Sequence, residues 1–234
     1  MAVPEAVAGL AAIPGIRTAA QLGEPTLESS TPTGSLPVAP ALAELVPGGL
    51  RRGSAVAVRG STALVLALLA EATREGSWAA IAGMPAVGVV AAAELGVDLN
   101  RLALVPDPGA ELVAVVSALI DGFDLVVLGQ AVARGIQPQL ARRLAGRTRN
   151  RGGVLLTTGP WPGADLEVHV SKRRWRGLAD YGFGHLESRE VVATCRGRGA
   201  AARPRAVALQ LPGAGGAVVA VDATANRRLS EAAG

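Results

Sequence analysis

The sequence predicts an α/β fold with a mostly parallel β-sheet that is flanked by helices and ends in antiparallel C-terminal strands. Half of the 234 residues are hydrophobic and 18% are charged, a composition that supplies a sizeable buried core. From residue 41 to residue 159, short apolar runs alternate with patterns of helical period. After residue 159 the helical patterns stop and only strand-like runs follow, which indicates an antiparallel continuation of the sheet.

The alternating region contains five expected strands and four expected helices. The strands are expected at 54–58, 78–82, 102–105, 124–128 and 153–158. The helices are expected at 62–75, 87–95, 111–120 and 137–149. Gly76 and Gly96 follow two of these helices as C-terminal caps. The run 124–128 has no polar alternation, so we expect a central parallel strand that is buried on both faces. Short connections between these elements predict right-handed β-α-β crossovers.

The chain divides into five segments by composition. An N-terminal helix (1–22) and a linker rich in Pro, Ser, Thr and Glu (23–40) precede the α/β core (41–159). A strand-rich basic extension of the same sheet (160–222) and a flexible tail (223–234) follow the core. The strands of the extension are expected at 166–170, 191–195, 206–211 and 217–221.

Charge is distributed unevenly along the chain. Residues 1–133 contain 6 basic and 12 acidic residues, whereas residues 134–205 contain 15 basic and 5 acidic residues. Lys172 is the single lysine among the 23 basic residues. Every chemistry that needs a lysine elsewhere in the chain is therefore excluded.

Several function classes have no support in the sequence. The longest apolar run, 62–70, is far shorter than the roughly 18 residues of a membrane span, so we expect no contact with a membrane. Cys195 is the only cysteine and no cleavable leader opens the chain, which predicts a reducing, cytoplasmic location. Two histidines and one cysteine form no metal cluster of known spacing, so we expect no metal.

Short motifs of the core occur in the same order, and at nearly the same intervals, as in the core of RecA-type recombinases. They are Thr33-Gly34-Ser35-Leu36, Pro47-Gly48-Gly49-Leu50, Val56-Ala57-Val58-Arg59-Gly60, Leu95-Gly96-Val97-Asp98-Leu99, Pro106-Asp107 and Asp124-Leu125-Val126-Val127-Leu128. The chain therefore resembles these recombinases over about residues 33–158. The resemblance implies a RecA-like fold.

The C-terminal strands resemble one branch of the RecA-like proteins. The motifs that carry this resemblance are Trp175-Arg176-Gly177, Gly182-Phe183-Gly184-His185-Leu186, Arg189 and Gly197-Arg198-Gly199. They are similar to the C-terminal part of ImuA-type proteins, the RecA-like accessory factors of inducible mutagenesis. The actinobacterial branch of that group, usually written ImuA-prime, is the most similar.

This resemblance implies a role in the SOS response to DNA damage. The protein would be a non-catalytic adaptor of the translesion-synthesis complex, or mutasome, which acts in DNA repair and mutagenesis. Its implied partner is a Y-family-polymerase-like protein of the ImuB type. Further implied partners are an error-prone replicative-type polymerase, RecA and, indirectly, the sliding clamp. Association with the nucleoid after DNA damage is implied as well.

Three positions of the sequence show whether the residues that ATP hydrolysis needs are present. A phosphate loop needs glycine amides around the phosphates, a lysine on the β and γ oxygens, and a hydroxyl on Mg²⁺. The segment Gly60-Ser61-Thr62 passes directly from strand to helix without a lysine. Glycine also replaces the two expected acids, with Gly83 after the second strand and Gly129 after the fourth. We therefore predict a protein that is not an enzyme and that uses no cofactor.

The helix start at Ser61 and Thr62 allows two interpretations. Its exposed amides could form a residual anion site, so that nucleotide binds without hydrolysis. Alternatively, Ser61 or Thr62 only caps a buried core helix, and this is the interpretation that we favour.

Two groups of residues are candidates for contact with DNA or with a partner protein. The first group lies on and just after the helix 137–149 and consists of Arg142, Arg143, Arg147, Arg149 and Arg151. The second group is expected to follow the strand 166–170 and consists of Lys172, Arg173, Arg174, Trp175 and Arg176. Guanidinium groups suit phosphate contact, and an adjacent indole can stack on an unpaired base. Arg and Trp are also typical of protein interfaces.

Three alternatives stay open. The basic groups could form a solvated edge, with Trp175 packed on the sheet. The protein could be a binding module for single-stranded DNA or for RecA filaments. It could also be a RecA-like inhibitor of cell division, because some RecA-like remnants resemble that family.

Overall fold

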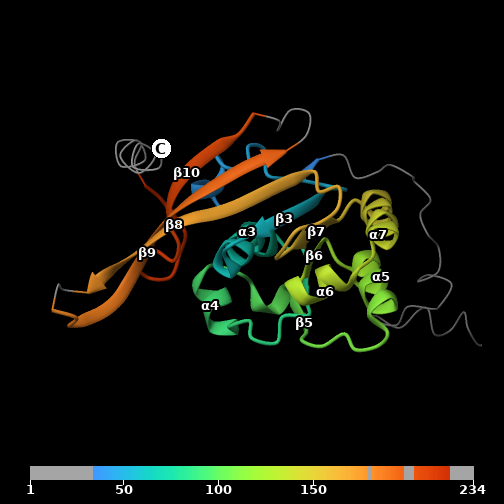
Figure 1. The fold of residues 1–234 in the computed structure, drawn as a ribbon, viewed down its shortest axis with the longest axis horizontal. Helices are drawn as coiled ribbons and strands as arrows, with labels where there is room; N and C mark the ends of the chain where they lie inside the picture. Colours follow the sequence, from blue (N-terminus) through green and yellow to red (C-terminus); the bar gives the residue numbers. More distant parts are fainter. Residues whose placement is uncertain (1–33, 179–180, 198–202, 222–234) are drawn as a thin grey trace, which may run out of the picture. The chain divides into compact units, whose positions relative to one another are not determined.

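A computed structural model describes residues 34–178, 181–197 and 203–221 (Figure 1). The predicted N-terminal helix (1–22), the linker up to residue 33 and the predicted tail (223–234) lie outside the described residues. The last residues of the predicted linker take part in the fold. There, β1 (Ser35–Leu36) pairs with β2 (Leu50–Arg51) in a small antiparallel sheet, and Leu36 is buried.

Nine strands of the described chain form one sheet in the order β11-β10-β9-β8-β3-β7-β6-β4-β5. Their bounds are β3 (Ala55–Arg59), β4 (Ala79–Ala82), β5 (Leu102–Val105), β6 (Leu125–Leu128), β7 (Val154–Thr157), β8 (Leu166–Leu178), β9 (Gly184–Gly197), β10 (Arg205–Gln210) and β11 (Val219–Ala220). Six neighbouring strands of this sheet run parallel, in the order β8-β3-β7-β6-β4-β5. The other three continue the sheet in antiparallel pairs. The predicted fold class is therefore confirmed.

Helices cover both faces of the parallel part of the sheet. They are α3 (Thr62–Arg74), α4 (Val89–Glu94), α5 (Leu112–Gly122), α6 (Gln130–Gly135) and α7 (Pro138–Arg151), with the 3-10 helices η1 (Pro40–Leu42) and η2 (Leu99–Arg101). Val56 and Val58 of β3 pack into the core cluster that includes α3, whereas Ala55 and Ala57 join the cluster that includes α5 and α7. None of the helices in the described part of the chain has the length and apolar composition of a transmembrane span.

Each strand and helix that the sequence predicts in the core is found within two residues at each end, whereas β2 and α6 were not predicted. Four strands of the extension are also predicted, but two of them are much longer than expected. The prediction that residues 172–176 follow a strand is wrong, because they lie inside β8. The strand continues there because β9 pairs with it through Arg176, so that cross-strand pairing, not an apolar run, defines the strand. Charged side chains are compatible with an antiparallel strand that has a solvated face.

Candidate functional site

The turn between β3 and α3 occupies the place where the resemblance implies a phosphate loop. Only Gly60 and Ser61 separate the strand from the helix. Ser61 is the N-cap of α3, and its hydroxyl oxygen accepts a hydrogen bond of 3.2 Å from the amide of Leu64. Ser61 is therefore the predicted N-cap of α3, and the residual anion site stays a prediction.

Arg189 of β9 reaches the same turn from the C-terminal extension. Its Nη2 lies 3.4 Å from the hydroxyl oxygen of Ser61, and its Nε donates to the carbonyl oxygen of Leu211 at 2.7 Å. The guanidinium also lies 5.4 Å from the centre of the Trp175 ring. Sequence reasoning gave Arg189 no such role, because only the register of β9 brings it to the start of α3. These contacts tie β8 and β9 to the centre of the sheet.

The ends of β4 and β6, where the resemblance implies acidic residues, are in backbone contact. The amide of Gly129 donates to the carbonyl oxygen of Ala82 at 2.8 Å. A Cβ atom at position 129 would collide with the carbonyl group of Gly83. A side chain at residue 129 therefore has no room unless both loops move.

Helix α7 carries the first predicted group of arginines, and the structure divides this group. Arg147 donates to both carboxylate oxygens of Asp121 on α5, and the Nε of Arg151 donates to the same carboxylate at 3.0 Å. The hydrogen bond from Arg147 is the main cause that holds the pKa of Asp121 below its usual value, although partial burial opposes it. These two arginines join α7 to α5.

The other three arginines of this group point to solvent. Arg142, Arg143 and Arg149 are exposed, and no ion pair is found for them within the described residues. They are thus the members of the group that are available for a ligand.

The second predicted group is divided by the alternation of side chains along β8. Trp175 lies opposite Arg189, whereas Arg174 lies opposite Glu190. Because neighbouring side chains of a strand point to opposite faces, Trp175 lies on one face and both Arg174 and Arg176 lie on the other. Lys172 and Arg173 belong to the same strand, and their side chains are outside the described part of the structure.

The two predicted groups do not form one surface. Figure 1 shows α7 at the right of the sheet and the hairpin end of β8 and β9 projecting from its left side. A single ligand that contacts both groups would have to span the sheet.

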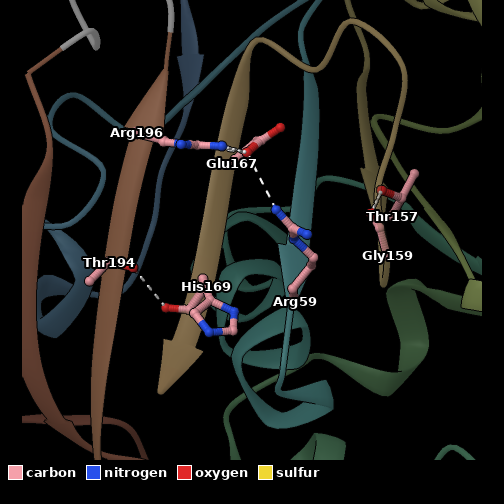
Figure 2. Close-up of polar contacts among 7 residues, drawn as sticks. All are labelled: Arg59, Thr157, Gly159, Glu167, His169, Thr194 and Arg196. Atoms are coloured by element: carbon pink, nitrogen blue, oxygen red, sulfur yellow. Dashed lines mark hydrogen bonds and ion pairs between the residues drawn. The ribbon is translucent and has the colours of Figure 1, made fainter. Parts of the chain in front are cut away.

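A cavity of about 380 Å³, which sequence reasoning missed, lies on the face of β3, β8 and β9 that carries their polar side chains. Its polar lining consists of Arg59, Glu167, His169, Thr194 and Arg196. Figure 2 shows Arg59 and Arg196 directed at Glu167 from the two neighbouring strands. The distances to the Glu167 carboxylate are 3.6 Å from Arg59 and 2.8 Å from Arg196. The pairing register of the three strands brings these residues together. Glu167 pairs with Arg196, and His169 pairs with both Arg59 and Thr194.

The side chains that line this cavity form a polar surface of the sheet, and the described residues show no arrangement of a nucleophile or a metal site there. The hydroxyl of Thr194 donates to the backbone carbonyl oxygen of His169, so it is not directed at the imidazole. Burial raises the pKa of the Cys195 thiol, which disfavours a thiolate nucleophile. Within the described ranges, no group of three or more His, Cys, Asp or Glu residues could hold a metal ion. The signal in the sequence was the alternation of Glu167 and His169 with the buried Val168 and Val170.

Comparison with known proteins identifies the family of the chain. Residues 44–163 match the family described as the MT3502 N-terminal domain. The uncharacterized protein Rv3395c of Mycobacterium tuberculosis (strain ATCC 25618 / H37Rv) is 38% identical over 165 residues, which are 66% of this chain and 80% of that protein. The family match covers the parallel strands from β3 to β7 with their helices and ends before β8. The chain is therefore a member of the MT3502 N-terminal domain family.

Proposed function

We propose that this protein is a non-catalytic adaptor of the ImuA type in a DNA-damage-induced translesion-synthesis complex. In this role it binds a Y-family-polymerase-like protein of the ImuB type, and its RecA-like core serves as a scaffold. The resemblance of the sequence motifs provides the identity of the complex. The geometry around α3 supports the absence of catalysis.

The backbone contact at Gly129 is the main observation that supports the non-catalytic part of the proposal. An ATPase of this kind needs an acidic residue near that position to hold or activate the groups around Mg²⁺. The carbonyl of Gly83 fills the space that such a side chain would need. Independently, Ser61 uses its hydroxyl as a helix cap, and the only lysine of the chain lies in β8. Packing contacts thus occupy two of the positions that ATPase machinery would need, and the turn lacks the lysine that would be the third part.

Co-expression of the whole chain with the ImuB-type protein from the same genome tests the adaptor role. We expect the two proteins to elute together in size-exclusion chromatography at low micromolar concentration. Separate elution would contradict the adaptor.

A phosphate-release assay with the purified chain tests the absence of catalysis. We expect the rate to equal that of buffer, both with and without single-stranded DNA. The Ser61→Ala variant is the control for contamination, because release that persists unchanged in this variant does not come from the β3–α3 turn. Release that depends on Ser61 would show that the turn retains catalysis.

Binding of single-stranded DNA is a second candidate function, favoured by the three solvent-facing arginines of α7. Fluorescence anisotropy of a labelled oligonucleotide should then show binding that weakens with salt. The double variant R142A/R143A should reduce the slope of log K against log salt by roughly 0.7 for each lost phosphate contact. Arg74→Ala is the matched control, since Arg74 is exposed but pairs with Glu71. Equal slopes for all three proteins would reject this function.

A further inference from the structure

The hairpin end of β8 and β9 concentrates the few aromatic residues of this chain. The whole sequence contains three Trp, one Tyr and two Phe. Three of these six lie between residues 175 and 183 and are exposed, with exposed fractions of 45% for Trp175, 87% for Tyr181 and 79% for Phe183. Leu178 and Leu186 of the same hairpin are 55% and 50% exposed. Exposed apolar residues that gather on one element in this way mark candidate interaction surfaces.

This part of the hairpin stands free of the sheet. β3 pairs with β8 only up to His169, and β10 pairs with β9 only from Glu190 onward. Backbone hydrogen bonds of Arg189 with Leu211 and Pro212 extend the second contact by one residue. From Val170 of β8 to Ser188 of β9, the two strands pair only with each other in the described chain. Figure 1 shows the resulting hairpin end extending past α3 and α4.

The conformation of the hairpin end is specified by the sequence. Gly177 and Gly184 have φ values of +103° and +121°, and a Cβ on either would collide with a backbone carbonyl of the facing strand. The pairing register shifts at this point, which redirects the strands as a bulge does. At the base, Arg189 is held by Leu211 and Ser61. The apolar residues are therefore presented on a supported element.

Charge around the hairpin end favours an acidic partner. Residues 172–190 contain five basic and three acidic residues. Glu190 pairs with Arg176 at 3.0 Å, and Glu187 lies 3.7 Å from His185. Arg174 is exposed and has no ion pair within the described ranges. The charge that is left for a partner is positive.

A protein partner fits these residues better than a nucleic acid does. Leucine side chains form no hydrogen bonds with bases or phosphates, whereas aliphatic, aromatic and arginine side chains together are typical of protein interfaces. Trp175 also lies on the face opposite Arg174 and Arg176, so one DNA strand could not stack on the indole and contact both guanidinium groups.

We propose that the described part of the hairpin end, residues 174–178 and 181–186, is the docking element of this protein for an apolar protein surface that is bordered by acidic residues. The inference rests on the proposed adaptor function and names the surface that would perform it. Tyr181 and Phe183 enter the apolar part of the partner, and Arg174 contacts its acidic border.

Binding of the full-length chain to the ImuB-type protein, measured by calorimetry, tests this inference. The double variant Y181S/F183S should weaken the affinity at least about thirtyfold, the effect of losing one interface hot spot. Val90→Ser is the matched control, because Val90 is 73% exposed on α4, and it should leave the affinity unchanged. Thermal unfolding should be the same for all three chains, since these side chains project into solvent.

The outcomes separate the two proposals. Undiminished binding by Y181S/F183S would overturn the docking element and leave the adaptor role intact. Absence of binding by the unaltered chain would overturn the adaptor role and the docking element together. The affinity of the same chains for a labelled single-stranded oligonucleotide is measured as well. If the double variant loses affinity for the oligonucleotide but keeps the protein partner, the hairpin is a nucleic-acid element and the inference is wrong.

Discussion

Single residues make packing contacts at the positions where the resemblance implies the groups of an ATP site. The hydroxyl of Ser61 accepts from the amide of Leu64 and so stabilises the start of α3. Arg189 provides a positive charge beside the same turn, but it comes from β9 and is held by a carbonyl oxygen and an indole ring. At the end of β6, Gly129 lets two loop backbones touch. Of these three positions, Gly129 is the one where the close backbone contact requires the residue type that is present.

Replacing Gly129 tests whether this contact is structural. We expect Gly129→Ala to lower the free energy of unfolding by about 2 to 3 kcal/mol, because the new methyl group meets the backbone of Gly83 and the loops must shift. Urea denaturation followed by circular dichroism measures the change. Gly135→Ala is the matched control, since a Cβ there meets no atom within 4 Å. Similar stabilities of the two variants would show that the loops yield easily and that an acid could have been accommodated.

The elements of the core could be predicted from the sequence because packing imposes a simple pattern on them. β6 and β7 are buried on both faces, so each appears as an uninterrupted apolar run. The six-residue helix α6 is too short to show a helical period and was missed, whereas α4, which has the same length, was predicted with Gly96 as its C-terminal cap. The ends of β8 and β9 were missed because no apolar pattern marks a hairpin whose two faces are solvated.

The candidate sites depend on the pairing register of the strands, which cannot be predicted from the sequence pattern. Arg59, Glu167 and Arg196 belong to three strands that are distant in sequence, and only their pairing brings them to one cavity. Likewise, the sequence places Trp175 next to Arg174 and Arg176, but the strand directs them to opposite faces. The residue types were predictable, whereas their grouping into surfaces was not.

The link between α5 and α7 gives a prediction at the level of elements. Asp121→Asn removes the partner of both Arg147 and Arg151 and should lower the free energy of unfolding by about 1 kcal/mol near pH 7. Because folding lowers the pKa of Asp121, this stability is fully present above its unfolded value of 3.8 and is lost as the pH falls through the lower folded value. Urea denaturation at several pH values should show the two chains converging in acid.

A control variant distinguishes the loss of the two ion pairs of Asp121 from the effect of removing one negative charge. Glu44→Gln removes the same single charge from an exposed residue with no ion pair in the described chain, so its stability should follow that of the unaltered protein. A constant difference between Asp121→Asn and the unaltered chain down to the acid limit would contradict an electrostatic origin.

At the scale of the whole molecule, the C-terminal extension is part of the central sheet. The family match ends at residue 163, yet β8 pairs directly with β3 in the middle of the sheet. Val168 and Val170 of β8 and Leu209 of β10 belong to the same core cluster as α3. The strands beyond the family match therefore complete the core, and within the described part of the extension the end of the hairpin projects beyond this core.

Truncation after Gly159 should consequently abolish folding. It removes β8 from the side of β3 and exposes one face of α3, because the valines and leucines that cover it are lost. We expect the shortened chain to unfold without a cooperative transition in urea, measured by circular dichroism, whereas a chain that ends at Val221 keeps every described strand and unfolds cooperatively. A cooperative transition in the 1–159 chain would show that the parallel part is an independent domain. If the expected result is obtained, loss of partner binding on truncation reflects unfolding, and only point variants of the hairpin can locate the docking surface.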